Sequence, residues 1–192
     1  GIGNATLNIV SFNSGNMNSA EFSNTFSGIT INASESYNSS GTFIANDSTL
    51  NFGSMNGTYD SINLFSSSLT LNKASDITLT SGKILIDNLS SFTIKGEEIF
   101  NNPNEINIVN DGKLNILAGN TLNSITNNIN ATTVLDGKSN IKLVDNYGIL
   151  ELHTGASIDE LNNMGTNENQ TSKVVLYGAN RVEKYDHNEF SE

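Results

Sequence analysis

The sequence predicts an all-β fold, a parallel β-helix in which short strands stack coil upon coil. Three observations lead to this expectation. Asn, Ser, Thr and Gly together make up roughly 47% of the chain, far above average usage. Short runs alternate apolar and polar residues, as half-buried strands do. These runs recur with a period of about 22 residues, near the length of one β-helix coil.

The runs that indicate strands follow one another through the first two thirds of the chain. Turn-forming Asn, Ser, Gly and Asp separate them. About eight coils at ~4.8 Å each would give a rod of roughly 40 Å. We expect apolar columns inside and Asn side chains hydrogen-bonded along the axis. The runs are Leu7–Val10, Ile29–Asn32, Thr42–Ala45, Thr49–Phe52, Ile62–Phe65, Leu69–Asn72, Ile77–Thr80, Lys83–Asp87, Phe92–Lys95, Glu105–Val109 and Leu114–Ala118.

Particular apolar positions repeat with the coil, and we expect them to stack inside. One predicted column is Ile44, Leu64, Ile86 and Ile108; a second is Leu50, Leu71, Ile94 and Ile116. Phenylalanines that alternate with polar neighbours should form a further interior column. They are Phe12, Phe22, Phe26, Phe43, Phe52, Phe65 and Phe92. Pro103 lacks the donor that a central strand needs, so Glu97–Asn104 is predicted to be a loop or short helical excursion.

The period of about 22 residues is lost in the last third of the chain. We interpret residues 1–132 as the coils and residues 133–192 as a capping segment of the same domain. Thr133–His153 carries an Asp-Gly hairpin signal. Ser157 followed by Glu160 forms a capping box, which predicts a short helix over 158–164. The tail Glu183–Glu192 is acidic and should fray. An antiparallel sandwich or barrel is the alternative, since Asx-Gly pairs also occur earlier in the chain.

Composition excludes several classes of protein. Twenty Asp and Glu against nine Lys and Arg give a net charge of −11, which argues against a nucleic-acid partner. The absence of Cys excludes disulfide scaffolds, zinc ribbons, iron–sulfur sites and thiol catalysis. No apolar run approaches the ~18 residues of a membrane span. Gly1 opens the sequence without a signal-peptide pattern, so we interpret the chain as a mature or excised fragment.

The sequence offers no convincing catalytic or metal site. The two histidines, His153 and His187, are far apart and lack patterned carboxylates, whereas a metal needs several convergent ligands. Glycoside hydrolysis needs two carboxylates at a controlled separation. Some acids lie on or beside neighbouring runs but are more simply turn residues: Asp76, Asp87 and Glu105, and likewise Asp136 and Asp145. We therefore predict no catalytic, cofactor-binding or metal-binding residues, and no enzyme.

Three segments resemble the coils of bacterial autotransporter passenger domains. They are Gly41–Ala45, Ser48–Gly53 and Ser68–Asn72. The Asn-rich composition is similar to that of the vacuolating-cytotoxin-like autotransporters of Helicobacter, and the resemblance covers about residues 28–130. It implies a right-handed β-helix that is secreted or displayed on the bacterial outer-membrane surface. It also implies contact with host cells.

We accordingly expect an adhesin or toxin-associated module that binds a host-cell surface protein or glycan. Loops on a rigid scaffold are where binding residues concentrate. The loops expected to do so are the excursions Ser11–Phe26, Glu97–Asn104 and Glu160–Ser172. The alternatives are a structural stalk that presents another module, and a glycan-active β-helix enzyme. Exposed coil ends also allow self-association, edge to edge.

Overall fold

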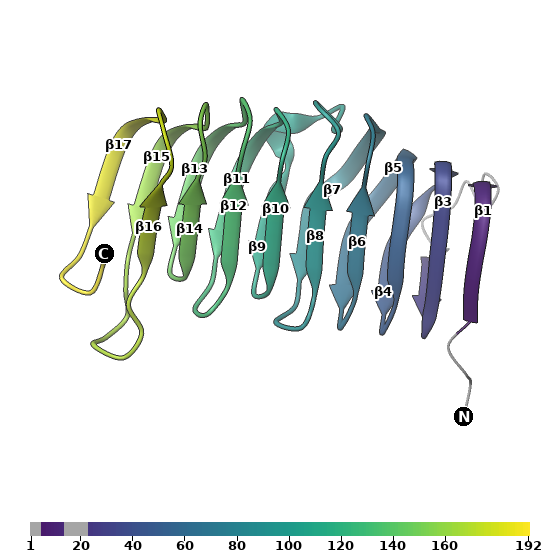
Figure 1. Cartoon of the computed structure of the whole chain (residues 1–192), viewed down its shortest axis with the longest axis horizontal. Helices are drawn as coiled ribbons and strands as arrows, with labels where there is room; N and C mark the ends of the chain where they lie inside the picture. The colour runs from purple at the N-terminus through teal and green to yellow at the C-terminus, as the bar shows by residue number, and fades with distance from the viewer. Residues whose placement is uncertain (1–4, 14–22) are drawn as a thin grey trace.

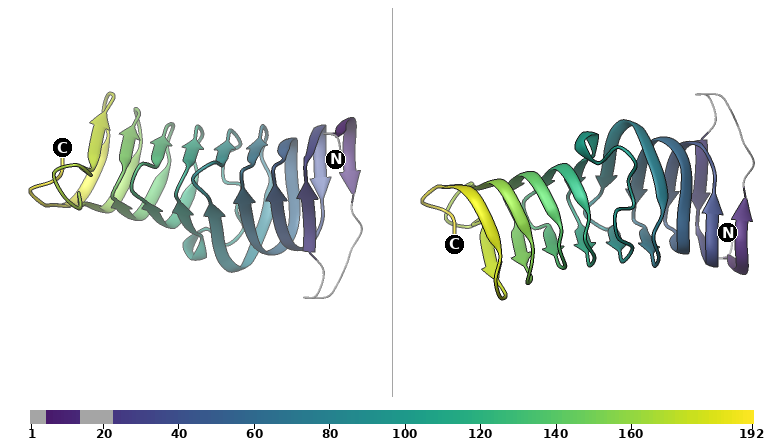
Figure 2. Two further views of the ribbon diagram at one scale, coloured as in Figure 1. Left: turned by 90° about the horizontal axis from the view of Figure 1, so that it is seen from below. Right: turned by 90° about the horizontal axis from the view of Figure 1, so that it is seen from above.

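The computed structural model describes residues 5–13 and 23–192, with side chains described from residue 25 onward. In this part, 17 strands form one continuous sheet that winds into a β-solenoid of about seven turns. The strands stack along one axis, with the first and the last described strands at opposite ends of the rod (Figures 1 and 2). The predicted parallel β-helix is therefore confirmed.

The strands form two long faces. We call one the first face; its strands are β1 (Ala5–Asn13), β3 (Ile29–Asn38), the start of β5 (Thr49–Phe65), β6 (Ser68–Leu71), β8 (Ser91–Ile94), β10 (Lys113–Ile116), β12 (Thr132–Leu135), β14 (Ile149–Leu152) and β16 (Lys173–Leu176). The second face consists of β2 (Ser23–Ser27), β4 (Gly41–Asn46), the ends of β5 and of β7 (Asp76–Ile86), β9 (Asn107–Asn110), β11 (Thr121–Asn127), β13 (Asn140–Asn146), β15 (Ser157–Asn163) and β17 (Arg181–His187). Within each face, every ladder is parallel.

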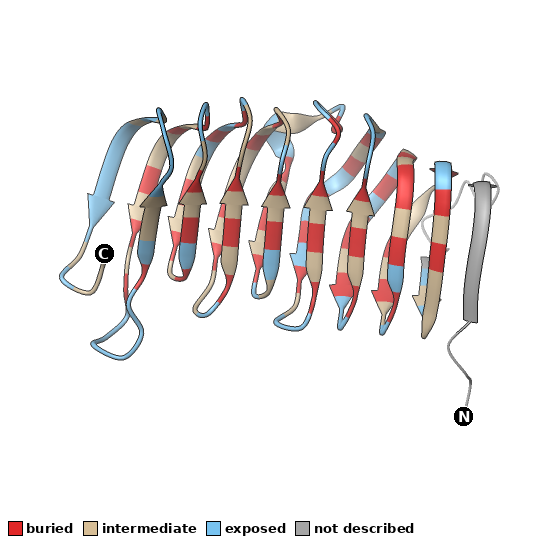
Figure 3. Cartoon of the chain, viewed as in Figure 1, coloured by how far each residue is buried: buried red, intermediate tan, exposed pale blue. Residues whose placement is uncertain are grey.

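Apolar side chains form continuous columns inside the rod, visible as repeated buried bands in Figure 3. On the first face one column, apolar except for Thr133, is Ile31, Leu50, Leu69, Phe92, Leu114, Thr133, Leu150 and Val174. The next inward column there is Ala33, Phe52, Leu71, Ile94, Ile116, Leu135, Leu152 and Leu176. On the second face the column is Phe43, Ile62, Ile84, Ile108, Ile125, Val144, Leu161 and Tyr185.

The two columns predicted from the sequence are each partly out of register. Leu64 does stack on Ile86, and Ile86 is buried as expected. Ile44, however, pairs with Asn63 and is not buried, and Ile108 stacks on Ile84 instead. In the second predicted column Leu71, Ile94 and Ile116 are aligned, but Leu50 pairs with Leu69. Coil length is the reason: stacked partners lie 17 residues apart in one coil and 23 in another, because turns absorb different numbers of residues.

The phenylalanines form part of an aromatic cluster in the N-terminal coils. Phe43, Phe52 and Phe92 are buried, as predicted, but they lie in three different columns, so the predicted phenylalanine column is wrong. Phe65 is exposed because it alternates with the inward-facing Leu64 in β5. Phe12 and Phe22 lie outside the residues whose side chains are described. Two tyrosines belong to the same cluster: the ring of Tyr37 stacks on that of Phe52 with 4.8 Å between ring centroids, and Tyr59 packs edge-on against Phe43. The ring centroids of Phe26 and Phe43 lie 5.2 Å apart.

A buried asparagine ladder replaces an apolar column halfway along the rod. The column that begins with Ala45, Leu64 and Ile86 continues in register as Asn110, Asn127, Asn146 and Asn163. Each Nδ2 donates to the next Oδ1, at 2.9, 2.7 and 2.8 Å. The predicted hydrogen bonding of Asn along the axis is thus confirmed in the interior. The same amides also donate to Thr132, Ile149 and Lys173 carbonyls, which ties the end of one face to the start of the other.

The hairpin and helix predicted for the last third are wrong. β12 and β13, on either side of Asp136-Gly137, each pair in parallel with strands of neighbouring coils. Residues 157–163 form β15, in which Ile158 and Leu161 are buried on Ile141 and Val144. Burying both side chains in the stack outweighs the local helix signal of the capping box. Among the described residues, an antiparallel bridge occurs at Asn167 and Gln170.

The predicted excursions differ in outcome. Glu97–Asn104 is a loop that leads into a 3-10 helix, Pro103–Glu105, and buries Ile99 and Phe100. Glu160–Ser172 begins inside β15 and becomes a loop from residue 164. Residues 14–22 of the first excursion lie outside the described residues. The acidic tail is ordered against β16, since Val174 N donates to Glu192 O at 2.8 Å.

Candidate functional site: a groove along one corner

The second-face strands end, and the first-face strands begin, at one corner of the rod. In the N-terminal coils this corner is tight: two residues separate Asn46 from Thr49, and two separate Phe65 from Ser68, where Thr49 and Ser68 begin first-face segments. Asp47 and Ser66 adopt positive φ, 47° each, which turns the chain sharply. These two turns therefore share one backbone shape and stack, and the residues beside them line a groove at this corner.

A ladder of buried serines lies at this corner, and Ser48 and Ser67 of the ladder line the groove. Ser48 N donates to Ser67 Oγ at 3.0 Å, and Ser67 N donates to Ser90 Oγ at 2.9 Å. The hydroxyls of Ser48 and Ser67 donate in turn to the carbonyls of Asn46 and Phe65, each at 2.8 Å. All three serines are buried. Their hydrogen-bonding capacity is used by the fold, so they shape the groove rather than bind a ligand.

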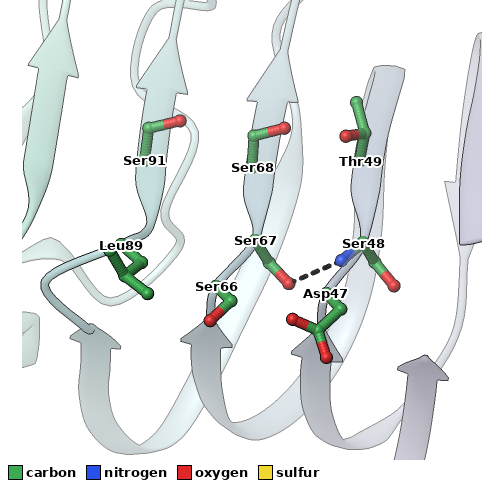
Figure 4. A pocket seen from close by; sticks show the side chains of 8 residues that line it. All are labelled: Asp47, Ser48, Thr49, Ser66, Ser67, Ser68, Leu89 and Ser91. Carbon is green, nitrogen blue, oxygen red and sulfur yellow. Dashed lines mark hydrogen bonds between the residues drawn. The ribbon is translucent and has the colours of Figure 1, made fainter. Parts of the chain in front are cut away.

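The groove opens into a hollow of about 400 Å³ (Figure 4). One side carries Thr49, Ser68 and Ser91, which are stacked in register at the first position of their strands. Asp47 and Ser66 are exposed on the other side, and Leu89 is 73% exposed. The hollow therefore offers repeated hydroxyl groups beside one apolar side chain.

The carboxylate of Asp87 is hydrogen-bonded to neighbouring residues of the chain. Its oxygens accept from Ser66 N at 3.1 Å, Leu89 N at 3.1 Å and Ser90 Oγ at 2.5 Å. These bonds fix the 87–90 turn. Asp47, by contrast, makes no ion pair or side-chain hydrogen bond within the described part of the chain. Asp47 is thus the acidic group of this hollow that is available to a ligand.

A second hollow, of about 490 Å³, continues along the same corner. It is lined by Asp87, Asn88, Asp111, Ile129 and Asn130. Asp111 accepts a hydrogen bond from Asn128 Nδ2 at 2.7 Å. The 87–90 turn contributes to both hollows. We call the two together the corner groove, and it again combines amide, carboxylate and apolar side chains.

The acids singled out from the sequence each have a local structural role. Asp76 accepts from Asn101 Nδ2, Glu105 from Asn102 at 2.9 Å, Asp136 from Gly137 N at 2.7 Å and Asp145 from Asn162 at 2.8 Å. His153 lies 3.6 Å from Glu151 and packs on Tyr177, while His187 stacks on Tyr185. Across residues 5–13 and 23–192, no three His, Asp or Glu side chains gather as a metal site would require.

Sequence reasoning placed binding on the excursions and missed the corner groove. A signal was present: Asn46-Asp47-Ser48-Thr49, Phe65-Ser66-Ser67-Ser68 and Asn88-Leu89-Ser90-Ser91 all precede an apolar strand position. Unequal coil length hid their alignment, since these serines lie 19 and 23 residues apart.

Comparison with known proteins identifies no relative of this chain. No helix in the described residues has the length and apolar character needed to cross a bilayer. No protein-family model matches the chain, and neither a curated protein nor a solved structure is significantly similar to it.

Proposed function

We propose that this chain is a binding module of a secreted or surface-displayed bacterial autotransporter, and that it contacts host-cell surface glycans through the corner groove. The observation that carries the proposal is the lining of the first hollow: Thr49, Ser68 and Ser91 in register, with Ser66, Asp47 and Leu89 opposite. Hydroxyl and carboxylate groups match a polyhydroxylated ligand, and Leu89 can contact the apolar face of a sugar ring.

The repeat of the solenoid supports an extended ligand rather than a compact one. Each coil adds an equivalent group about 4.8 Å further along the axis. Individual contacts are then weak, and affinity comes from their number. A glycan chain lying along the corner would meet both hollows, since the 87–90 turn contributes to each.

Binding is favoured over catalysis by the state of the carboxylates. Asp87 and Asp111 are held by hydrogen bonds that shape the turns, which leaves Asp47 as the free acid of the first hollow. Hydrolysis of a glycosidic bond needs a pair of carboxylates working together. We therefore propose recognition of a glycan rather than its cleavage.

The test is binding of fluorescently labelled protein to cultured epithelial cells, with excess unlabelled protein as competitor. The groove variant combines Thr49→Val, Ser68→Ala and Ser91→Ala. The matched control combines Thr70→Val and Thr93→Val, which lie two positions further along β6 and β8 and are half-buried, as Ser68 and Ser91 are. We expect saturable binding that the groove variant weakens at least tenfold, about 1.4 kcal/mol, and that the control preserves.

Pretreatment of the cells separates the two classes of partner. Periodate oxidation, which destroys sugar diols, should abolish binding, and protease treatment alone should not. Loss of binding after protease but not after periodate would replace the glycan by a protein partner. Absence of saturable binding, or equal losses in both variants, would refute the proposal and favour a structural stalk.

A further inference from the structure

The corner groove is lined by carboxylates and by no basic side chain. Asp47 lines the first hollow, and Asp87 and Asp111 line the second. Asp47 and Asp111 are exposed, and Asp87 is half-buried. Among the residues that the structure describes, none of the three takes part in an ion pair. A ligand in the groove therefore meets negative charge that no salt bridge has neutralised.

The hydrogen bonds that hold two of these acids leave their charge in place. Asp87 accepts from backbone N–H groups and a serine hydroxyl, and Asp111 accepts from Asn128 Nδ2 at 2.7 Å. These donors are neutral, so they orient the carboxylates and add no positive charge. Lys113 follows Ser91 in the stacked row of the first face, but it lines neither hollow. One cation therefore lies beside a groove that holds three carboxylates.

The coil repeat spreads these charges along the groove. Asp47, Asp87 and Asp111 belong to the first, third and fourth of four successive corner turns, as the hydrogen bonds between neighbouring turns show. At ~4.8 Å per coil, these turns span roughly 14 Å along the axis. Every point between them lies within about 5 Å, measured along the axis, of a turn that carries a carboxylate. That separation is shorter than the Debye length of ~8 Å at physiological salt, so the charges act on a ligand over this whole length.

We propose that the corner groove selects neutral glycans and rejects acidic ones, and that Asp47 and Asp111 determine this selectivity. Acidic glycans are chains that carry sialic acid, uronate or sulfate groups. The inference rests on the glycan binding proposed above and adds the class of sugar. The hydroxyls of the groove can donate to or accept from any sugar, so they contribute affinity without distinguishing charge. Repulsion between like charges supplies the discrimination, because a site gains specificity from an element that disfavours the wrong partner.

Sialidase treatment of epithelial cells provides the test, because it removes terminal sugars that carry a carboxylate. Binding of the labelled protein is measured before and after treatment. Binding of the wild type should rise about threefold or more, a size that suits contacts between exposed charges. The groove-charge variant combines Asp47→Asn and Asp111→Asn, which keep the shape of both side chains. Without the repulsion, its binding should rise by less than about 1.5-fold.

The matched control combines Asp60→Asn and Asp76→Asn, which change the net charge equally. Both acids are exposed, and Asp76, like Asp111, accepts a hydrogen bond from an asparagine amide, here Asn101 Nδ2. Asp60 lies within β5 and Asp76 begins β7, whereas the groove turns flank β5 and follow the end of β7. The control should keep the rise of the wild type. Sodium chloride at about 0.5 M screens the repulsion and should reduce that rise toward the value of the groove-charge variant.

The outcomes separate this inference from the proposed function. Absence of saturable binding before and after sialidase, or binding that periodate leaves intact, overturns the proposed glycan binding and the selectivity with it. Saturable, periodate-sensitive binding that sialidase leaves unchanged or lowers overturns the selectivity alone. An equal rise in the wild type and the groove-charge variant, or a rise that salt does not reduce, also overturns it, because sialidase would then act by uncovering other sugars rather than by removing repulsion.

Discussion

Replacing Asn127 by Ala removes the central rung of the buried asparagine ladder. Its Nδ2 donates to Asn146 Oδ1 at 2.7 Å and to Ile149 O at 2.9 Å. Its Oδ1 accepts from Asn110 Nδ2 at 2.9 Å and from Thr133 Oγ1 at 2.8 Å. The residue is fully buried, so water does not take the place of the lost partner.

The expected cost follows from the groups left without partners. Asn110 Nδ2 keeps Thr132 O and Thr133 Oγ1. The Asn146 oxygen and the Thr133 hydroxyl proton lose theirs. A buried polar group without a partner costs about 1–3 kcal/mol, so the two together lower the free energy of unfolding by about 2–6 kcal/mol.

The matched control is Asn51→Ala, in an outward-facing asparagine pair. Asn51 Nδ2 donates to Asn32 Oδ1 at 2.8 Å, but both residues are half-buried. Water can replace the lost amide, so the loss should be at most about 1 kcal/mol. Urea unfolding followed by circular dichroism measures both variants. Equal losses, or a loss below about 0.5 kcal/mol for Asn127→Ala, would refute the view that the interior ladder holds the C-terminal coils together.

Three further changes probe the stack. Ile86→Asp places an unpaired charge in an interior column, so it should lower the free energy of unfolding by about 3 kcal/mol or more. An unchanged thermal transition would contradict the inward assignment of Ile86. Gly148→Ala brings a Cβ to 2.4 Å from Ala131 O and should cost about 2 kcal/mol in urea, whereas Gly119→Ala, whose nearest atom lies at 3.4 Å, should cost under about 1 kcal/mol; similar losses would show that the close coil contact is absent. Burial raises the pKa of Tyr59 above its usual range, so the unfolded chain ionises first and stability falls as pH rises above about 10, by up to about 1.4 kcal/mol per pH unit; Tyr59→Phe should flatten this decline, and an identical pH profile would refute the assignment.

The fold class could be predicted from the sequence, but the register between stacked strands could not. Alternation marks a strand locally, and Leu71, Ile94 and Ile116 were aligned correctly because their coils are of similar length. Leu50 was assigned to the wrong column because its coil is shorter, with partners 19 residues apart. Register depends on how many residues each turn absorbs, and that is decided by contacts between coils.

The C-terminal errors have the same origin. The capping box at Ser157 and Glu160 is a local helix signal, yet Ile158 and Leu161 gain burial on the preceding coil. Glu160 then pairs with Lys184 of the following coil at 2.6 Å. That ion pair, like the corner groove, joins residues that are distant in sequence and become neighbours only when the coils stack.

The most direct test of the functional account is a hydrogen–deuterium exchange footprint. The protein is compared alone and with epithelial plasma-membrane vesicles. The account predicts added protection at the stacked corners, residues 46–49, 65–68 and 87–91, with little change in the excursion loops. Protection confined to residues 97–104 and 164–172, with exchange at the three corners unaltered, would contradict it and return binding to the excursions.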